Sequence, residues 1–247
     1  MAHLPHRLLN NKYIVIRTVA ITESTNADMI ALVASGIAEG TWLRAEAQSG
    51  GRGRMGRGWQ SPLGNLYAST LVRLRAGDPP APTLALVTAV ALFDVVAAYA
   101  PDVMAAIKWP NDVLIAGAKL AGILLERAGD GVVVGIGVNL AHHPEGLDRP
   151  VTSLAAHGVT PDPAQFCEDL ALTFARWVAR WRGEGLAPVH AAWLAVAHPL
   201  GTALVANLGD GESIEGLFDG LNDAGALRLR LADGAVRVIH AGDVFLI

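Results

Sequence analysis

Hydrophobic and polar residues follow patterns that predict a chain of mixed strands and helices. Apolar residues recur at spacings of three and four in Pro163 to Trp181, which predicts an amphipathic helix. Thr83 to Tyr99 is apolar almost throughout, which predicts a helix buried in the core. β-Branched and aromatic runs bounded by turn residues predict strands. These strands are Tyr13 to Val19, Thr41 to Gln48, Leu66 to Leu74, Val113 to Ile115, Lys119 to Glu126 and Val132 to Asn139. Two further helices are predicted, one that begins after Ser24 and stops at Gly36 and one over Pro188 to Ala197.

The pattern changes near the end of the chain. From Leu200 onward, short apolar runs alternate with turns such as Gly-Asp and Asp-Gly, which predicts about five strands in a small all-β unit of SH3-like size. We expect the boundary between His198 and Gly201, with one domain over residues 1–198 and a second over residues 199–247. The predicted fold class is α+β, with a mixed central β-sheet packed with helices and a small SH3-like β-barrel at the C-terminus.

Composition narrows the class of protein. The chain has 247 residues, of which 52% are hydrophobic, so it is long enough to bury a large core. Its formal net charge of -4 argues against a protein that binds nucleic acid, and its one cysteine, Cys167, excludes an internal disulfide. The N-terminal residues lack an apolar run of signal-peptide length, and the longest apolar stretch, Leu84 to Phe93, is too short to span a bilayer. A cytoplasmic protein without membrane contact is expected.

The densest chemistry lies in Gln48 to Ser69, QSGGRGRMGRGWQSPLGNLYAS. Arg52, Arg54 and Arg57 alternate there with five glycines between residues 50 and 58. Glycine lets backbone N–H groups approach a ligand closely, and the guanidinium group matches carboxylate and phosphate oxygens, so the stretch predicts an anion-binding loop. A basic surface loop is the alternative. The glycines also satisfy the G-x-G-x-x-G pattern of dinucleotide-binding folds, but Pro62 and Gly64 prevent the helix that this pattern requires.

A second dense stretch, Ala106 to Glu126, is predicted to form a hairpin with Lys108, Asn111, Asp112 and Lys119 near its base. No P-loop, H-E-x-x-H or G-x-S-x-G motif is found in the sequence. A glycine and arginine loop, a lysine and an Asn-Asp turn together suit activation of a carboxylate by a nucleoside triphosphate, because fixed cations neutralise the charge that develops when two anions react. The Asp112 carboxylate could then hold Mg²⁺ indirectly, through the phosphates, or accept a proton.

At these residues the sequence resembles the biotin protein ligases, also called biotin acetyl-CoA-carboxylase ligases. The matching segments are Ser24-Thr25-Asn26, Gln48 to Trp59 with GRGRMGRGW, Ser61-Pro62, Gly64-Asn65-Leu66, KWPNDV at Lys108 to Val113, KLAGILLE at Lys119 to Glu126 and GIGVNL at Gly135 to Leu140. More loosely, the Gly-Asp-Val pattern near the end of the family's C-terminal domain matches Gly242-Asp243-Val244. The resemblance implies a class II synthetase-like catalytic domain followed by an SH3-like domain. It also implies that biotin and ATP, with Mg²⁺, form biotinoyl-5′-AMP before the biotinyl group passes to a lysine of a biotin carboxyl carrier domain.

The resemblance also implies roles for individual residues, several of which have simpler interpretations. Ser24 could serve only as a helix N-cap, Trp59 as a core residue, and Lys108 with Trp109 as a brace for the hairpin. Lys119, Asp112 and Arg54 are the implied catalytic residues. The implied biotin contacts are Ser24, Thr25, Asn26, Gln48, Arg52, Gly53, Arg54 and Lys119, and the implied ATP or adenylate contacts are Arg54, Arg57, Trp59, Asn111, Asp112, Lys119 and Asn139.

The expected partner is the biotin carboxyl carrier protein or domain of acetyl-CoA carboxylase or of a related carboxylase. Longer members of the family carry a DNA-binding domain before the Ser-Thr-Asn segment, whereas about 20 residues precede it here, so we expect no DNA binding and no repressor activity. The family often pairs edge strands into dimers, which leaves a homodimer open. Two alternatives are a lipoate or octanoate ligase of the same superfold and a non-catalytic biotin-binding module.

Overall fold

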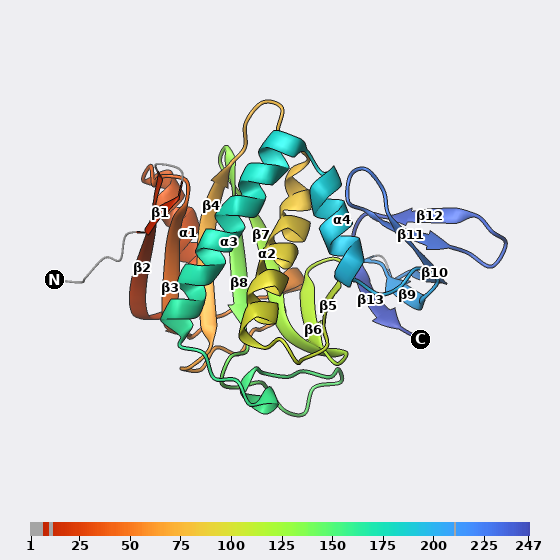
Figure 1. Ribbon diagram of the computed structural model, residues 1–247, viewed down its shortest axis with the longest axis horizontal. Coiled ribbons are helices and arrows are strands. Elements are labelled where there is room, and N and C mark those ends of the chain that lie inside the picture. The colour runs from red at the N-terminus through yellow and green to blue at the C-terminus, as the bar shows by residue number, and fades with distance from the viewer. Residues whose placement is uncertain (1–6, 10–11, 210) are drawn as a thin grey trace.

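A mixed eight-stranded sheet forms the centre of the protein (Figure 1). The structure, a computed structural model, describes residues 7–9, 12–209 and 211–247. The N-terminal segment, for which the sequence predicts no signal peptide, lies partly outside the described residues. The strand order is β1-β2-β3-β4-β8-β7-β6-β5, and only β2 and β3 pair in parallel. The strands are β1 (Arg7–Leu9), β2 (Lys12–Thr22), β3 (Thr41–Gln48), β4 (Leu66–Arg73), β5 (Ala105–Lys108), β6 (Asp112–Ile115), β7 (Ala118–Ala128) and β8 (Gly131–Val138).

The two faces of this sheet differ because strand residues alternate between them. On β8, Val134 and Ile136 face the main hydrophobic core, whereas Val133 belongs to a smaller cluster under helix α1 (Thr25–Ala34). Gly135 and Gly137 share the face of Val133. This alternation leaves one face with bulky side chains for the core and the other with glycines beside α1.

Three helices cover the core face: α2 (Leu84–Tyr99), α3 (Pro163–Glu184) and α4 (Ala187–Val196) (Figure 1). The segment Ala81–Tyr99 is long and apolar enough to cross a membrane by length and composition. In the fold, Leu84, Val87 and Leu92 are fully buried against the sheet and its neighbouring helices. The prediction of a core helix is therefore confirmed, and the apolar character of its first half follows from the burial of nearly every residue from Leu84 to Leu92.

Helix α3 is amphipathic, as its spacing predicts. Phe166, Phe174 and Trp181 are buried, and Trp42 of β3 meets Phe174 edge to face at 5.6 Å between ring centroids. Cys167 is fully buried on the same helix, and burial raises the pKa of its thiol to about 12. A thiol buried in apolar surroundings is unreactive, so Cys167 packs as a small apolar side chain.

The C-terminal strands form a separate antiparallel sheet in the order β12-β11-β10-β9-β13. This sheet lies beside α4, where Trp193 and Phe218 pack with ring centroids 6.2 Å apart, and Trp109 donates a hydrogen bond to the carbonyl of Gly225. The mixed α+β class with a second small sheet is confirmed, while the division at residue 198 stays a prediction. The strands are β9 (Ala203–Asn207), β10 (Ser213–Leu221), β11 (Leu227–Arg230), β12 (Val236–Ile239) and β13 (Asp243–Leu246).

Candidate active site

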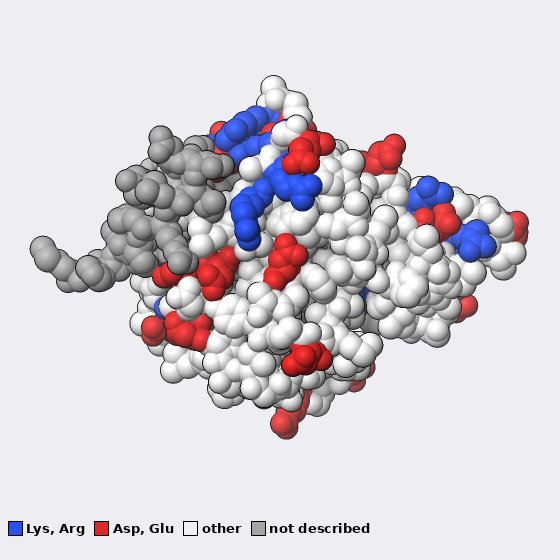
Figure 2. Space-filling view, in the orientation of Figure 1, with Lys and Arg blue, Asp and Glu red and all other residues white. Residues whose placement is uncertain are grey.

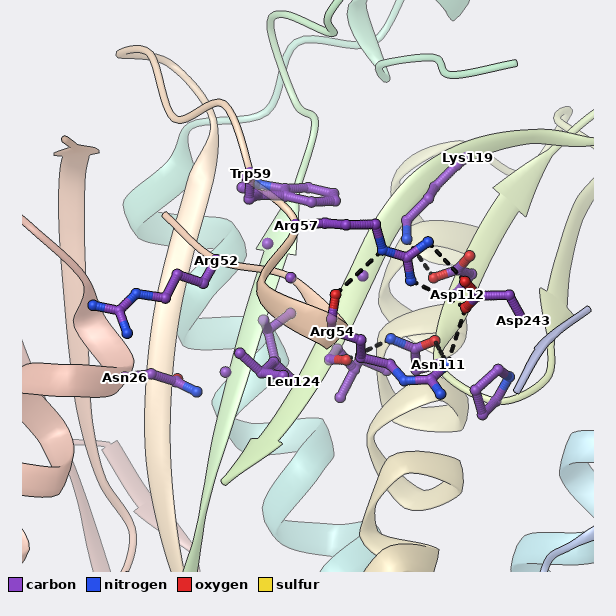
Figure 3. Close-up of a pocket in the computed structure, with 18 of the residues that line it drawn as sticks. Asn26, Arg52, Arg54, Arg57, Trp59, Asn111, Asp112, Lys119, Leu124 and Asp243 are labelled. Carbon is purple, nitrogen blue, oxygen red and sulfur yellow. Dashed lines mark hydrogen bonds and ion pairs between the residues drawn. The ribbon is translucent and has the colours of Figure 1, made fainter. Parts of the chain in front are cut away.

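One pocket opens on the glycine-bearing face of the central sheet (Figure 3). Its walls come from the start of α1, the arginine and glycine loop over residues 50–58, the β5–β6 turn, β7, β8 and the first residues of β13. Every residue predicted to bind biotin or ATP lines this pocket except Asn139. The fold thus brings together segments that lie more than 200 residues apart in the sequence.

The floor of the pocket requires glycine. A Cβ atom on Gly137 would lie 2.7 Å from the indole of Trp59, and one on Gly135 would lie 2.2 Å from the Asn26 side-chain oxygen. Gly122 on β7 is similarly close to the same indole, at 3.3 Å. The structure shows that these glycines admit the side chains of Trp59 and Asn26.

The wall at the start of α1 is polar and internally hydrogen-bonded. Ser24 caps the helix through Ala27 N, as its simpler interpretation holds, and it also lines the pocket. The Ser69 hydroxyl lies 2.8 Å from Thr25 Oγ1 and 2.5 Å from Asn26 Oδ1, and Asn26 Nδ2 donates to a carboxylate oxygen of Glu126 at 2.6 Å. Such a network fixes the side chains before any ligand arrives.

Gln48 joins this wall to the arginine loop. Its side-chain oxygen accepts a hydrogen bond from Thr25 N at 2.8 Å, and its side-chain nitrogen donates to Ser61 Oγ at 3.0 Å. Gly51 lies beside this contact, where a Cβ atom would be 2.6 Å from Ser61 Oγ. Gln48 therefore links the start of α1 to the segment that follows the arginine loop.

Lys119 and Asp112 form a buried ion pair on neighbouring strands. Lys119 Nζ lies 2.5 Å from Asp112 Oδ1, and Lys108 Nζ lies 3.5 Å from Asp112 Oδ2. Burial lowers the pKa of Lys119; Asp112 opposes this shift, and Arg149 and Lys108 add to it. Lys119 Nζ also lies 5.5 Å from the centre of the Trp59 ring. A buried, paired ammonium group beside an open pocket can stabilise an anion that enters it.

The loop arginines Arg54 and Arg57 point toward Asp243, on the same side of the pocket as this pair (Figure 3). Arg54 Nη1 donates to Asn111 Oδ1 at 3.4 Å, and Asn111 is itself anchored by a 2.7 Å hydrogen bond to the carbonyl of Ile123. Both guanidinium groups also meet Asp243 of the C-terminal sheet, with Arg57 Nη1 2.8 Å from Asp243 Oδ2 and Arg54 Nη1 3.5 Å from Asp243 Oδ1.

Arg52 has a different orientation. Its guanidinium group points away from the other two arginines and lies 3.2 Å from Glu23 Oε1 (Figure 3). Its side chain is 54% exposed, although the residue contributes to the pocket lining. The structure therefore brings Arg54, Arg57, Asp112 and Lys119 to one place and leaves the Arg52 guanidinium outside that group.

Asn139 lies in a smaller adjoining pocket that shares Trp59, Lys119 and Arg149 with the first. Its side chain is buried and donates to the carbonyl of Thr152 at 3.0 Å. Trp59 stands between the two pockets, and its buried indole N–H has no hydrogen-bond partner among the described residues. A ligand that extends past Trp59 would reach the neighbourhood of Asn139.

No group of three or more His, Cys, Asp or Glu side chains suited to a metal ion occurs within residues 7–9, 12–209 and 211–247. The Asp112 carboxylate is already flanked by two ammonium groups. Mg²⁺ commonly binds proteins through one or two carboxylates together with substrate phosphates. The residues present fit an ion that arrives on the phosphates of ATP, and a contribution from Asp112 stays a prediction.

Three further residues line the pocket, and no binding role was predicted for them. Lys108, for which a brace was the simpler interpretation, has its ammonium group facing Asp112 and 5.4 Å from the centre of the Phe245 ring. In the sequence, Asp243 has only the C-terminal Gly-Asp-Val pattern to mark it, and Arg149 carries no signal. Their approach to the arginine loop depends on the tertiary fold.

Comparison with known proteins agrees with this geometry. Residues 20–140 match the Biotin/lipoate A/B protein ligase family, and residues 205–247 match the Biotin protein ligase C terminal domain. A biotin acetyl-CoA-carboxylase ligase of Paracoccus denitrificans is 44% identical over 239 residues, which cover 92% of this chain and 98% of the relative. A ligase of the same name from Mycobacterium tuberculosis is 37% identical over 92% of this chain and 86% of its own length.

The solved structures extend the likeness to the fold. The biotin protein ligase of Aquifex aeolicus in complex with biotin and ATP superimposes with a TM-score of 0.84, covering 94% of this chain and 99% of that one, at 24% identity. Both sheets lie within this shared architecture. The chain belongs to the biotin protein ligase family and is a ligase by class.

Proposed function

We propose that this protein activates biotin with ATP and transfers the biotinyl group to a lysine of the biotin carboxyl carrier domain of acetyl-CoA carboxylase. The observation that supports this most is the convergence of Lys119, Arg54 and Arg57 on one pocket whose opposite wall is the polar start of α1. Relatives named for this activity cover nearly the whole chain. Their names favour biotin over lipoate as the substrate.

In the first step, a carboxylate oxygen of biotin attacks the α-phosphorus of ATP. The bond between the α-phosphorus and the bridging oxygen to the β-phosphate breaks, and pyrophosphate leaves. We assign Lys119 and Arg54 to the neutralisation of charge between the two reacting anions, because fixed cations in a water-poor pocket stabilise such a transition state strongly. Mg²⁺ bound to ATP supplies further neutralisation of the phosphate charge when it is present.

In the second step, the ε-amine of the acceptor lysine attacks the acyl carbon of biotinoyl-5′-AMP, and AMP leaves with the bonding electron pair. The attacking amine loses a proton, for which Asp112 is our candidate acceptor. Asp112 has a second role that its contacts support, since its 2.5 Å pairing with Lys119 fixes the position of that ammonium group.

Biotin is proposed to lie between the sheet floor and the wall formed by Ser24, Thr25, Asn26 and Gln48. The hydrogen-bonded network of this wall presents fixed polar groups, and Leu124 adds apolar surface on the same face of β7. We assign the nucleotide to the side of Trp59 and Asn139, with Arg57 and Asn111 near its phosphates. Arg52 and Gly53 complete the loop that would border the ligand.

The proposed setting is the cytoplasm, where ATP and a reduced Cys167 are expected. The absence of DNA and membrane partners remains a prediction from the acidic charge balance, and a homodimer remains open.

The direct test is incubation of the protein with biotin, Mg-ATP and a carrier domain, read by the mass of the carrier. We expect one biotinyl adduct, and none on a carrier whose acceptor lysine is replaced by arginine. Replacing biotin with lipoate tests the related ligase activity. A lipoyl adduct formed in preference to a biotinyl adduct would overturn the substrate assignment.

Pyrophosphate release separates an enzyme from a binding module. The protein with biotin and Mg-ATP, without any carrier, should release about one pyrophosphate per active site and then slow, because the adenylate stays bound. If biotin binds in a calorimeter but no pyrophosphate appears, the protein is a biotin-binding module and the catalytic assignment is wrong.

A further inference from the structure

Asp243 stands out among the residues that the C-terminal sheet contributes to the pocket. The other two, Val244 and Phe245, are apolar, so Asp243 alone of these three carries a charge. It sits at the start of β13, which pairs with β9 from Asp243 opposite Asn207 to Leu246 opposite Leu204. The carboxylate is therefore held by a regular strand, whereas the arginines that it meets stand in a glycine-rich loop.

The contacts between them resemble those of a bound anion. Arg57 approaches Asp243 with both terminal nitrogens, at 2.8 Å to Oδ2 and 3.0 Å to Oδ1. Arg54 approaches the same carboxylate at 3.5 Å and donates to the neighbouring carbonyl of Gly242 at 3.2 Å. Paired N–H groups on two oxygens are the geometry with which arginine also holds phosphate.

The electrostatic surroundings of Asp243 are strongly cationic. Burial raises the pKa of Asp243, but the hydrogen bonds and charge of Arg57, with Arg54 and Lys108 behind them, outweigh burial and hold the pKa below its usual range. The pocket lining contains Asp112 and Asp243 as its carboxylates, against the cations Arg52, Arg54, Arg57, Lys108, Lys119 and Arg149. Asp243 thus offsets one of these positive charges, at the two arginines that it contacts.

The ion pair between Arg57 and Asp243 is exposed enough for another anion to replace the carboxylate. The side chain of Arg57 is 41% exposed and that of Asp243 is 25% exposed, and ion pairs at such exposure contribute little to stability. Arg52, the remaining arginine of the loop, pairs in the same way with an exposed carboxylate outside the loop, that of Glu23. All three loop arginines therefore have protein carboxylates as partners, and a phosphate that uses them must compete with those carboxylates.

We propose that Asp243 is an internal competitor of polyphosphate for Arg54 and Arg57, and that it weakens the hold of the pocket on pyrophosphate so that this product can leave. The proposal rests on the proposed function, since adenylation leaves pyrophosphate beside these arginines. Cleavage of the α–β anhydride puts additional negative charge on the departing group, which would bind the arginines tightly. Return of the guanidinium groups to Asp243 offsets that attraction, which makes Asp243 a positioning residue for product release.

The test is the affinity of the protein for inorganic pyrophosphate, measured by calorimetry without biotin or ATP. The Asp243→Asn variant keeps the size of the side chain and removes its charge. We expect it to bind pyrophosphate about two- to fivefold more tightly than the unsubstituted protein, an effect in the range of exposed charge pairs. Asp243→Glu keeps the charge and should restore an affinity close to that of the unsubstituted protein.

A matched control exists in the same sheet. Asp219 on β10 lies 2.7 Å from Arg228, and its side chain is 28% exposed, close to the exposure of Asp243. Asp219→Asn makes the same change in net charge away from the pocket and should leave pyrophosphate binding unchanged. An equal gain in both variants would show a general charge effect and overturn the proposal.

Steady-state kinetics provide the second readout. In Asp243→Asn, the KM for ATP should fall and inhibition by pyrophosphate should strengthen by a similar factor, while kcat falls because product leaves slowly. A residue that only braces the two sheets would instead lower the urea midpoint and weaken pyrophosphate binding. Unchanged or weaker binding in a folded Asp243→Asn variant contradicts the proposal.

The two proposals fail separately. If the unsubstituted protein forms no biotinyl adduct, the proposed function is wrong whatever the calorimeter shows. If the adduct forms but Asp243→Asn binds pyrophosphate no more tightly, only the role of Asp243 is wrong. Should Asp243→Asn fold poorly, Asp243→Ser provides an uncharged variant on which the same prediction is judged.

Discussion

Two clusters of arginine and carboxylate side chains lie at different places on this protein. They differ in how firmly the surrounding structure holds their arginines. The pocket cluster consists of Arg54, Arg57 and Asp243. The brace cluster consists of Arg75, Arg182, Glu39 and Asp78, at the end of the molecule where α3 ends. Figure 2 shows basic and acidic side chains gathered together over that end.

The brace cluster is anchored on helix α3 through Arg182 and is reinforced by the backbone. Arg182, near the end of α3, meets Glu39 at 2.6 Å and Asp78 at 3.4 Å and donates to the carbonyl of Arg73 at 2.6 Å. Its side chain is only 15% exposed, and that of Asp78 is 8% exposed. Arg75 meets the same Glu39 at 2.8 Å. These contacts tie α3 to the segments on either side of β3 and β4.

The pocket cluster differs in its support, not in its chemistry. Its arginines stand in the loop between β3 and β4, where Met55 has a positive φ of 55° and Gly56 one of 71°, so the chain turns sharply there. The same kind of ion pair is a brace when its arginine is largely buried on a helix, as Arg182 is. It becomes a replaceable contact when its arginine is exposed in a loop, as Arg57 is at 41%, and replaceable contacts are what a substrate anion requires.

The largest expected difference in activity between substitutions near the two clusters comes from Lys119, which lies beside the pocket cluster. Lys119→Ala should lower adenylate formation roughly 10²- to 10³-fold, because one fixed cation is lost where charge develops. The measurement is the rate of pyrophosphate release with biotin and Mg-ATP. Arg180→Ala, on the exposed side of α3 where it pairs with Glu184, is the control and should keep the rate. A near-normal rate in Lys119→Ala would remove this residue from its role.

Arginine removal should affect the two clusters differently. Arg182→Ala leaves Glu39 and Asp78 with incomplete partners and should cost about 2–3 kcal/mol of unfolding free energy, below the value for fully buried pairs. Arg57→Ala should cost less than about 1 kcal/mol, as expected for an exposed pair, while raising the KM for ATP. Urea unfolding and initial-rate kinetics on both variants measure this crossed pattern. Similar losses of stability in the two variants would show that the clusters are equivalent.

Limited proteolysis tests the difference in support directly. Trypsin should cut after the arginines of residues 52–57 several-fold faster than after Arg73 or Arg75, because cleavage requires a segment that opens locally. Biotin with Mg-ATP should slow the loop cuts, because we expect this glycine-rich loop to close over the adenylate. Mass spectrometry of the early fragments identifies the sites. Equal cutting of the loop with and without the two substrates would contradict closure.

The smallest expected effect is a pH dependence from the brace cluster. Burial raises the pKa of Glu39, but Arg182 and then Arg75 outweigh it and lower the pKa below 4.5. Because the folded-state pKa is the lower one, the stabilisation is present above about pH 4.5 and is lost as the pH falls through the folded-state value. Glu39→Gln should therefore show a smaller drop in urea midpoint between pH 7 and pH 4 than the unsubstituted protein. An identical drop would show that Glu39 carries none of this dependence.

Most of the fold was predictable because local periodicity decides it. Thr41–Gln48 is a strand with the predicted bounds, and α3 extends the predicted helix from Trp181 to Glu184. Toward the end of β8, valine and isoleucine alternate with glycine. This alternation indicates which face of the strand packs on the core and which face lacks bulky side chains. Such patterns need no knowledge of distant segments.

The candidate site was predictable where its residues lie in dense local motifs. Gln48, Arg54, Asp112 and Lys119 were all named from the sequence and all line one pocket. The direction of a side chain was not predictable, as Arg52 shows by facing Glu23 and not the other arginines. Orientation depends on which opposite charge lies nearest in space, and the spacing along the chain does not contain that information.

The sequence by itself determined the order and type of the elements, the arginine and glycine loop, and the glycine positions of the sheet floor, because these follow from periodicity and residue chemistry over short distances. Only the tertiary structure decided that Trp59 and Asn26 occupy the space above those glycines, and that Asp243 meets Arg54 and Arg57 from 186 residues away or more. The physical reason is that an ion pair between distant segments requires the packing of two sheets. Composition and periodicity specify each sheet, but the docking of one against the other places their charges together.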